Sequence, residues 1–282
     1  MQPWFTWKNK NSYNDFGLWI NKLPPIVRSN ERHEEITVPG REGTLLMTEG
    51  EDVYDSYLKE CVVIVPNTRN IQPILAWLRG NGDVTFCNEV DFAYEARIIG
   101  EVSFERINNS LSQATIPFFV KPYKKRVHGE PDMTITASGT IVNPGDVASK
   151  PMVRVQKTGA AKIVIGDTSM EFTHLPGDVM IDCDAGLITT KAGTYSASAY
   201  YYVGDYANYS GDSTYSAGLY RFTSEGLGEN TTWERVGNQV QNYEYVWQGS
   251  WTGKFLRIPA GRSAITLTGS PTLTVQPKWR WV

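Results

Sequence analysis

The sequence has few cysteines, few histidines and no long apolar run. Its three cysteines, Cys61, Cys87 and Cys183, form no Cys-x-x-Cys pair, which argues against a disulfide framework and against a structural zinc site. No stretch approaches the roughly 18 consecutive apolar residues of a membrane-spanning helix, so we expect no membrane partner. Residues 1–10 lack the apolar run of a signal peptide, so we expect synthesis in a cytoplasm.

The charges are nearly balanced. Lys and Arg number 27 and Asp and Glu number 30, a formal net charge of -3. Binding to a phosphate backbone needs a basic face, so a dominant role in nucleic-acid binding is disfavoured. The one basic run comprises Lys121, Lys124, Lys125 and Arg126, and we interpret it as a solvated linker or a contact to an acidic partner.

No motif indicates catalysis, a metal or a cofactor. The three histidines, His33, His128 and His174, lie far apart in the sequence and do not have the spacing of metal ligands. There is no Gly-x-Ser-x-Gly, Walker or Rossmann motif. A glycoside hydrolase needs two carboxylates across a groove, an arrangement that the sequence does not reveal. We therefore predict no catalytic residue, metal site or cofactor, and keep a wall-degrading enzyme only as a remote hypothesis.

Aromatic residues and alternating patterns dominate what is present. The chain is 12% aromatic, with nine Trp and fifteen Tyr. Apolar residues recur at every second position in many segments, for example Val153 and Val155, or Ile163 and Ile165, and turn signals follow at intervals of about ten residues. This pattern indicates half-buried β-strands in sandwiches or barrels. The predicted fold class is therefore mainly β.

One segment has helical spacing instead. Ile71, Ile74, Leu75 and Leu78 predict a short amphipathic helix over residues 69–79, capped by Asn67 or Thr68 and ended by Gly80, with Ile71, Leu75 and Leu78 on a sheet. A polar stretch after a strand-like run at residues 114–120 predicts a domain boundary. We predict an N-terminal domain of residues 1–125 and a C-terminal domain of residues 126–282.

A segment over residues 194–250 differs in composition from the rest, because it is rich in Tyr, Ser, Gly and Asn and poor in aliphatic residues. We interpret it as an insertion on the second domain. One hypothesis is a glycan-binding surface, in which rings stack on sugars; the other is an extra β layer whose rings pack on protein. The candidate rings for either contact are Tyr200, Tyr201, Tyr202, Tyr206, Tyr209, Trp247 and Trp251.

Several short motifs near the N-terminus occur in an order that resembles the distal tail (Dit-like) proteins of long-tailed phages and prophages of Gram-positive bacteria. They are Asp15-Phe16-Gly17-Leu18-Trp19-Ile20, Leu23-Pro24-Pro25-Ile26, Val38-Pro39-Gly40-Arg41-Glu42-Gly43, Trp77-Leu78-Arg79-Gly80-Asn81-Gly82-Asp83 and Asp91-Phe92-Ala93-Tyr94-Glu95-Ala96-Arg97-Ile98. Later pieces fit more loosely: Val142-Asn143-Pro144-Gly145, Ser149-Lys150-Pro151, Ile181-Asp182, Ile258-Pro259-Ala260-Gly261 and Pro277-Lys278-Trp279-Arg280-Trp281.

The resemblance implies an N-terminal β-sandwich with one short helix and a hairpin arm, followed by a galectin-like sandwich. It also implies a homohexameric ring, assembled in the bacterial cytoplasm and placed at the virion tail tip. That ring would contact the tail tube protein, the tail-tip protein and, in some phages, receptor-binding proteins, while DNA passes through it. We assign the arm to residues 44–65, with Leu45, Leu46, Val53 and Tyr57 as the candidate ring interface.

Two functions therefore stay open at this stage. The first is a structural hub of a phage or prophage tail tip, which has no turnover. The second is a carbohydrate-binding adsorption module that uses the aromatic insertion on a host cell-wall glycan. Both functions are compatible with one chain.

Overall fold

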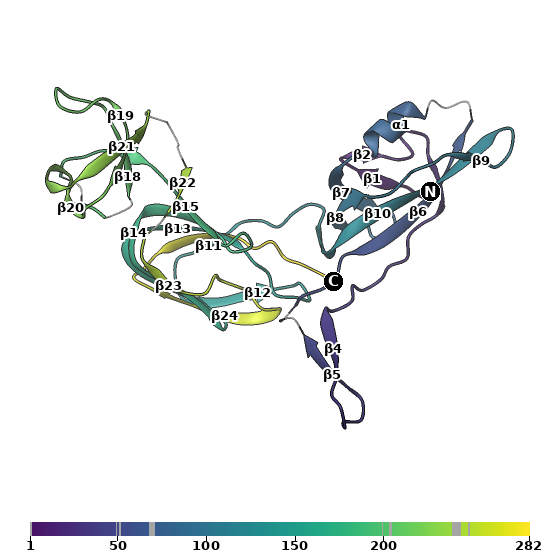
Figure 1. Cartoon of the computed structure of the whole chain (residues 1–282), viewed down its shortest axis with the longest axis horizontal. Helices are drawn as coiled ribbons and strands as arrows, with labels where there is room; N and C mark the ends of the chain where they lie inside the picture. The colour runs from purple at the N-terminus through teal and green to yellow at the C-terminus, as the bar shows by residue number, and fades with distance from the viewer. Residues whose placement is uncertain are drawn as a thin grey trace. The chain divides into compact units, whose positions relative to one another are not determined.

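The chain folds into two compact units. The computed structural model describes residues 2–48, 50, 52–67, 71–198, 200–202, 205–238, 244–247 and 249–282. Unit 1 comprises residues 1–129 and 280–282, and unit 2 comprises residues 130–279. Both consist almost entirely of β-sheet (Figure 1), so the predicted mainly β fold with two domains is confirmed. The predicted boundary at residue 125 lies inside a strand, and the last three residues belong to unit 1.

The main sheet of unit 1 has eight strands in the order β2-β1-β7-β8-β10-β6-β3, and β9 pairs with β10. The bounds of these strands and of the one helix are β1 (Phe5–Trp7), β2 (Lys10–Asn11), β3 (Trp19–Lys22), β6 (Tyr57–Pro66), α1 (Gln72–Trp77), β7 (Asn81–Phe86), β8 (Phe92–Ile98), β9 (Glu105–Arg106) and β10 (Leu111–Arg126). Strands β4 (His33–Thr37) and β5 (Thr44–Thr48) form a separate two-stranded sheet.

This sheet curls, so that β1 and β10 face each other across the core. Phe5 lies on β1 and Phe118 on β10, with β7 and β8 between them in the sheet order. In a flat sheet, strands three positions apart are separated by roughly 14 Å, yet the centroids of these two rings lie 5.4 Å apart. A single curled sheet therefore supplies both layers of the N-terminal core.

Helix α1 closes this core. It spans Gln72–Trp77, shorter than the predicted helix, and residues 68–70 lie outside the described part of the chain. Ile74, Trp77 and Leu78 are its buried side chains. Ile71 and Leu75, which we predicted to face the sheet, are only half-buried, so the predicted inner face is wrong by part of a turn. Asn67 does not cap the helix; its side chain bonds to Asn108 and Ser112 instead.

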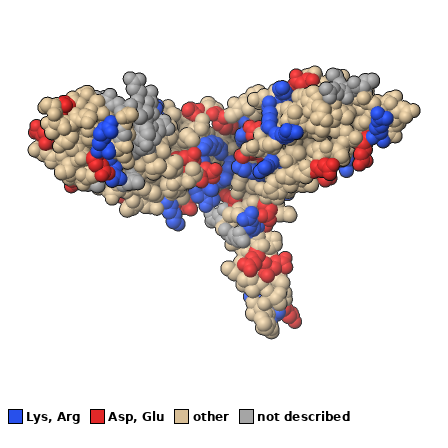
Figure 2. All heavy atoms as spheres, turned by 45° about the horizontal axis from the view of Figure 1, so that its top comes forward, with Lys and Arg blue, Asp and Glu red and all other residues tan. Residues whose placement is uncertain are grey.

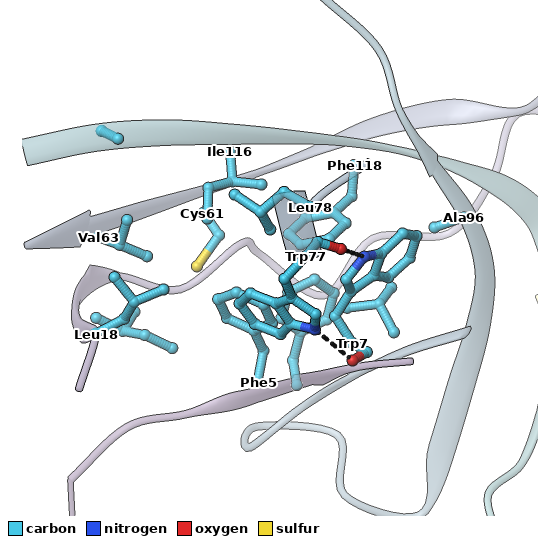
Figure 3. Packing of buried hydrophobic residues seen from close by; sticks show 14 of the residues in the cluster. Phe5, Trp7, Leu18, Cys61, Val63, Trp77, Leu78, Ala96, Ile116 and Phe118 are labelled. Carbon is cyan, nitrogen blue, oxygen red and sulfur yellow. Dashed lines mark hydrogen bonds between the residues drawn. The ribbon is translucent and has the colours of Figure 1, made fainter. Parts of the chain in front are cut away.

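Two tryptophans tie α1 to the first strand (Figure 3). The indole N–H of Trp7 donates to the carbonyl of Trp77 at 3.1 Å, and the indole N–H of Trp77 donates to the carbonyl of Trp7 at 2.9 Å. Phe5 stacks on Trp77 with ring centroids 5.6 Å apart. Both buried indole donors are thereby satisfied, which removes the main cost of burying tryptophan.

Unit 2 contains a nine-stranded sheet with the main order β11-β25-β13-β14-β15-β22. Strand β24 pairs with β12 and β13, and β23 pairs with β14. The bounds are β11 (Met133–Ile135), β12 (Gly139–Asn143), β13 (Met152–Ile165), β14 (Thr168–Asp182), β15 (Leu187–Lys191), β22 (Glu244–Val246), β23 (Trp251–Gly253), β24 (Gly261–Thr268) and β25 (Thr272–Gln276).

The long hairpin of β13 and β14 is shared by two halves of this sheet. The first half of β13 pairs with β25, where Val153 lies opposite Val275. The second half pairs with β24, where Ile165 lies opposite Ile265. A register shift after Gly159 separates the halves, as expected for a bulge that bends a sheet. All four of these side chains are buried, so both halves contribute to one core.

The insertion has its own small sheets between β15 and β22. They comprise β16 (Gly193–Thr194), β18 (Tyr206–Tyr209), β19 (Gly218–Phe222) and β21 (Trp233–Gly237), a pair of β17 (Tyr200–Tyr201) and β20 (Gly226–Leu227), and a short 3-10 helix η1 (Gly228–Asn230). Strands β22 and β23 return to the main sheet, so the predicted insertion extends too far at its C-terminal end.

The packing of α1 yields a first prediction. Replacement Trp77→Ala should lower the unfolding free energy of unit 1 by about 3–5 kcal/mol, the usual cost of removing a buried aromatic side chain. Trp19→Ala is the matched control, because Trp19 is exposed and surface substitutions cost about 0.5 kcal/mol or less. Urea titration followed by circular dichroism measures both variants. Equal losses would contradict the assigned core.

Candidate assembly site

The hairpin of β4 and β5, residues 33–48, is the arm of this protein (Figure 1). Its strands pair only with each other in the named sheets. At its tip the backbone N–H of Arg41 donates to the carbonyl of Val38 at 3.1 Å, and Gly40 has φ of +81°. Val38-Pro39-Gly40-Arg41 therefore forms the type II turn that a Pro-Gly pair favours. An isolated two-stranded hairpin of this kind is only marginally stable in water.

The two faces of the arm differ. Residues directly opposite each other share a face, and neighbours along a strand lie on opposite faces. Ile36 pairs with Leu45 and Glu34 with Met47, so one face carries three apolar side chains. The opposite face carries His33, Glu35, Leu46 and several threonines. We call the set Ile36, Leu45 and Met47 the apolar arm face.

The predicted position of the arm is wrong in part. Leu45 and Leu46 do lie in the arm, where 37% and 59% of their surfaces are exposed. Val53 and Tyr57 do not, because the second predicted strand, β6, belongs to the main sheet and Tyr57 packs against its core. The other strand of the arm is residues 33–37, which the predicted range of 44–65 leaves out. Of the two leucines, only Leu45 lies on the apolar arm face.

The base of the arm is fixed to the end of β10. On the incoming side, the Arg32 side chain donates to the Asp55 carboxylate at 2.9 Å, and its backbone N–H donates to Val53. On the outgoing side, the Tyr123 hydroxyl donates to the carbonyl of Asp52, and its ring meets Tyr54 edge-on. The base is thus held by polar and aromatic contacts, whereas the apolar arm face stays uncovered.

Residues from the C-terminal end of the sequence pack on the same part of unit 1. Arg280 lies over the ring of Tyr123, 4.3 Å from its centroid. Trp281 exchanges two backbone hydrogen bonds with Lys124 and meets Phe92 at 5.3 Å. Tyr123 is therefore contacted by Arg280 and also bonds to the base of the arm.

A buried group of charges lies beneath this region. The ammonium group of Lys59 is 3.2 Å from one carboxylate oxygen of Glu89, and that of Lys124 is 3.2 Å from the other. The Tyr94 hydroxyl donates to the same carboxylate at 2.7 Å. The side chains of Lys59 and Glu89 are 1% and 5% exposed. We call Lys59, Glu89, Tyr94 and Lys124 the ionic cluster.

The ionic cluster also holds the segment that leads into the arm. Lys59 donates to the carbonyl of Pro25 at 3.0 Å, and the neighbouring Asn88 donates to the carbonyl of Pro24 at 3.1 Å. A few residues further, the Ser29 hydroxyl donates to the carbonyl of Pro122. Hydrogen bonds therefore hold segment 24–29 on the sheet. They join it to Lys59 of β6, to Asn88 of the β7–β8 turn and to the carbonyl of Pro122 in β10.

The ionisation of the cluster follows from burial and pairing. Burial alone would raise the pKa of Glu89, but the Tyr94 hydrogen bond and the charges of Lys59 and Lys124 outweigh it and hold that pKa below its usual range. Burial lowers the pKa of Lys59, and the charge of Glu89 offsets part of this effect. Burial, and then the bond to Glu89, raise the pKa of Tyr94, which therefore remains a hydrogen-bond donor.

The basic run near residue 121 is not a linker. It is the last part of β10, and its charges are paired within unit 1. Lys121 meets Glu95 at 2.7 Å, Lys125 meets Asp83 at 2.9 Å, and Lys124 enters the ionic cluster. Arg126 lies over the ring of Trp281. The interpretation as a solvated linker is therefore wrong.

The aromatic residues of the insertion pack mainly on one another. The ring of Trp233 has four tyrosine rings with centroids within 5.2 Å, those of Tyr195, Tyr209, Tyr215 and Tyr220. Tyr201 stacks on Phe222 at 3.9 Å, and Tyr202 stacks on His174 at 3.7 Å. Tyr206 is half-buried, and the side chain of Tyr200 lies outside the described part of the structure.

Of the two tryptophans of the candidate glycan set, Trp251 lies on the main sheet of unit 2 and Trp247 directly follows strand β22 of that sheet. Trp247 is 6% exposed, and its ring packs on Phe172 at 5.9 Å. Its assignment as a surface contact is therefore wrong. Trp251 lies on β23 and packs edge-on against Phe255 at 5.0 Å, so it is half-buried. In the described part of the chain, the ring contacts of these two tryptophans are with Phe172 and Phe255, not with tyrosines of the insertion.

The described residues show no metal-binding group and no membrane-spanning helix. Among them, no group of three or more His, Cys, Asp or Glu side chains is placed to hold a metal ion. No helix in the same ranges has the length and apolar character needed to span a membrane. The three cysteines are unpaired, and burial raises the pKa of Cys61 and of Cys183 to about 12, so both thiols are unreactive at neutral pH.

Comparison with known proteins identifies the fold. No family model matches the sequence, and no curated protein matches it. A crystal structure of the SPP1 Dit (gp 19.1) protein, described as a paradigm of the hub adsorption apparatus in phages that infect Gram-positive bacteria, is similar to this chain with a TM-score of 0.60. The similarity covers 98% of each chain at 12% sequence identity. The mainly β, two-domain, Dit-like fold that the sequence resemblance implied is therefore confirmed.

The ionic cluster yields a second prediction. Glu89→Gln leaves the buried Lys59 and the half-buried Lys124 without their counter-charge and should lower the unfolding free energy of unit 1 by about 3–5 kcal/mol at pH 7. Glu95→Gln is the control, since the exposed pair of Glu95 with Lys121 contributes about 1 kcal/mol or less. Urea titration measures both variants, and a Glu89 variant as stable as the control would contradict the assigned cluster.

The same variant has an expected pH dependence. Because the pKa of Glu89 is lower in the folded than in the unfolded protein, its ionisation stabilises the fold above the ordinary carboxyl pKa of about 4.3. That contribution is lost as the pH falls through the lower folded pKa. The unfolding free energy of the unmodified protein should therefore fall more steeply below about pH 4.3 than that of Glu89→Gln. Parallel curves would show that Glu89 is not held ionised by the cluster.

Proposed function

We propose that this chain is a structural hub protein of a phage or prophage tail tip. The observation that carries the proposal is its fold, which is similar to that of the SPP1 Dit protein over 98% of both chains. The exposed arm gives this fold a means of assembly, because a hairpin with an uncovered apolar face is stabilised when a neighbouring copy covers it. The role is assembly and not catalysis.

The proposed assembly is a homohexameric ring. The arm and the surface that receives it are different parts of the chain, so the contact is heterologous and closes into a ring when the rotation between copies permits. The ring would join the tail tube protein to the tail-tip protein and, where present, to receptor-binding proteins. It would be assembled in the bacterial cytoplasm, and DNA would pass through it at ejection. The net charge of -3 suits such passage, since a basic lumen would retain the duplex.

The carbohydrate-binding alternative stays a prediction. Most rings of the insertion contact other rings of the same module, which favours a packing role over an exposed platform. Tyr215 is the most exposed of the tyrosines around Trp233, with 43% of its surface accessible. A binding test on cell-wall polysaccharide with the full chain distinguishes the two roles.

Two neighbouring leucines give a matched test of the arm. Leu45→Ser should weaken ring assembly at least tenfold, because a Leu side chain that becomes buried contributes about 1.5–3 kcal/mol. Leu46→Ser removes the same side chain from the opposite face and should leave assembly unchanged. Analytical ultracentrifugation over a concentration series measures the hexamer fraction. Equal effects of the two variants would contradict an arm that docks through one face.

A further inference from the structure

Segment 280–282 belongs to unit 1, although the whole of unit 2 precedes it along the chain. It is seated by a backbone bridge: the N–H of Lys124 donates to the carbonyl of Trp281 at 2.9 Å, and the N–H of Trp281 donates to the carbonyl of Lys124 at 3.1 Å. The ring of Trp281 also meets that of Phe92 with centroids 5.3 Å apart, and the guanidinium group of Arg126 lies over it. The segment is therefore docked on the last part of β10.

This bridge occupies the edge of β10 that β6 leaves. Strand β6 pairs with β10 as far as Val120, which lies opposite Tyr57, the first residue of β6. Strand β8 covers the other edge of β10 and pairs with Lys124 there. Because a strand has two edges, Trp281 pairs with Lys124 on the β6 edge. The chain that leaves the arm enters β6 at Tyr57, so segment 280–282 and the base of the arm meet the same edge of β10.

Tyr123 connects the segment to the base of the arm. The guanidinium group of Arg280 lies over its ring, 4.3 Å from the centroid, where the ring attracts a cation. The Tyr123 hydroxyl donates to the carbonyl of Asp52, and the ring meets that of Tyr54 edge-on with centroids 6.1 Å apart. Asp52 has φ of +58°, an uncommon conformation for a residue other than glycine. A contact that holds its carbonyl therefore helps to keep the chain in this turn.

The base of the arm is a short ladder between the chain that enters the arm and the chain that leaves it. The N–H of Arg32 donates to the carbonyl of Val53 at 2.8 Å. The N–H of Asp55 donates to the carbonyl of Asn30 at 2.9 Å, and Tyr54 pairs within the same ladder. Figure 2 shows the arm as a narrow projection, so its direction is set by this ladder. Whatever holds Tyr54 therefore also holds the arm.

We propose that segment 280–282 is a strap that fixes the base of the arm. Seated on β10, the strap holds Arg280 over Tyr123, and Tyr123 holds the turn at Asp52 and the ring of Tyr54. When the strap leaves β10, Tyr123 loses this partner and the ladder opens more often, so the arm loses its fixed direction. The strap acts within one chain, and its test does not depend on the proposed ring.

Amide exchange followed by NMR on the unassembled chain tests the strap. Arg280→Ala removes the cation and leaves the backbone bridge in place. Exchange of the base amides, those of Arg32 and Asp55, should become about two- to fivefold faster, the factor that an exposed contact between a cation and an aromatic ring contributes. Lys278→Ala is the matched control, because it removes the same charge two residues earlier, from an ion pair within unit 2. It should leave both amides unchanged.

A double-variant cycle tests the path through the tyrosine. Tyr123→Phe keeps the ring under Arg280 and removes the hydroxyl that bonds to Asp52, so it should also speed exchange of the base amides. If Arg280 acts through this tyrosine, the factor for the combined variant should be smaller than the product of the two single factors. Factors that multiply in full would show two independent contacts and would overturn the strap.

The remaining outcomes separate the strap from the proposed function. Base amides that exchange at the original rate in Arg280→Ala, or equally fast in Arg280→Ala and Lys278→Ala, overturn the strap and leave the hub function standing. Slow exchange of the β10 amides in every variant confirms that the sheet is folded, so faster exchange at the base reports the ladder alone. An unmodified chain that stays monomeric at every concentration counts against the ring, whereas the exchange result still decides the strap.

Discussion

A two-stranded sheet that exposes an apolar face is only marginally stable in water, and β4 and β5 form such a sheet. Among the described residues these strands form a sheet of their own, and Met47 is 52% exposed. Burial of that face by a neighbour would supply the stabilisation that the arm lacks by itself. In the proposed ring, assembly and the folding of the arm would be one process, and the base of the arm in unit 1 would hold it in position.

The base of the arm shows how this presentation is achieved. Tyr123 bonds to the outgoing side of the base, and the ionic cluster fastens the incoming segment through Pro25. Buried ion pairs seldom add net stability, because desolvation cancels much of the attraction. Their use here is geometric: Glu89 binds two lysines from different strands, and those strands determine where the arm begins. A rigid base under a free hairpin limits the entropy lost when the arm docks.

Much of the fold could be predicted from the sequence. Apolar residues alternate along β13 and β24, so the side chains that form the core of unit 2 could be predicted from this pattern. The predicted arm, residues 44–65, begins too late, although the Pro39-Gly40 turn before it is a strong local hairpin signal. Lys59 lies in phase with Cys61 and Val63, which indicates a buried lysine, but its partner Glu89 is 30 residues away and no local pattern connects them.

Hydrogen–deuterium exchange of the β4 and β5 amides, in assembled and in dilute dissociated protein, tests the central claim most directly. The account predicts slow exchange of the arm in the assembled protein and fast exchange in the dissociated one, while the strands of the main sheet stay protected in both. Fast exchange of the arm in the assembled protein would contradict the claim, because an arm that a neighbour covers cannot open freely.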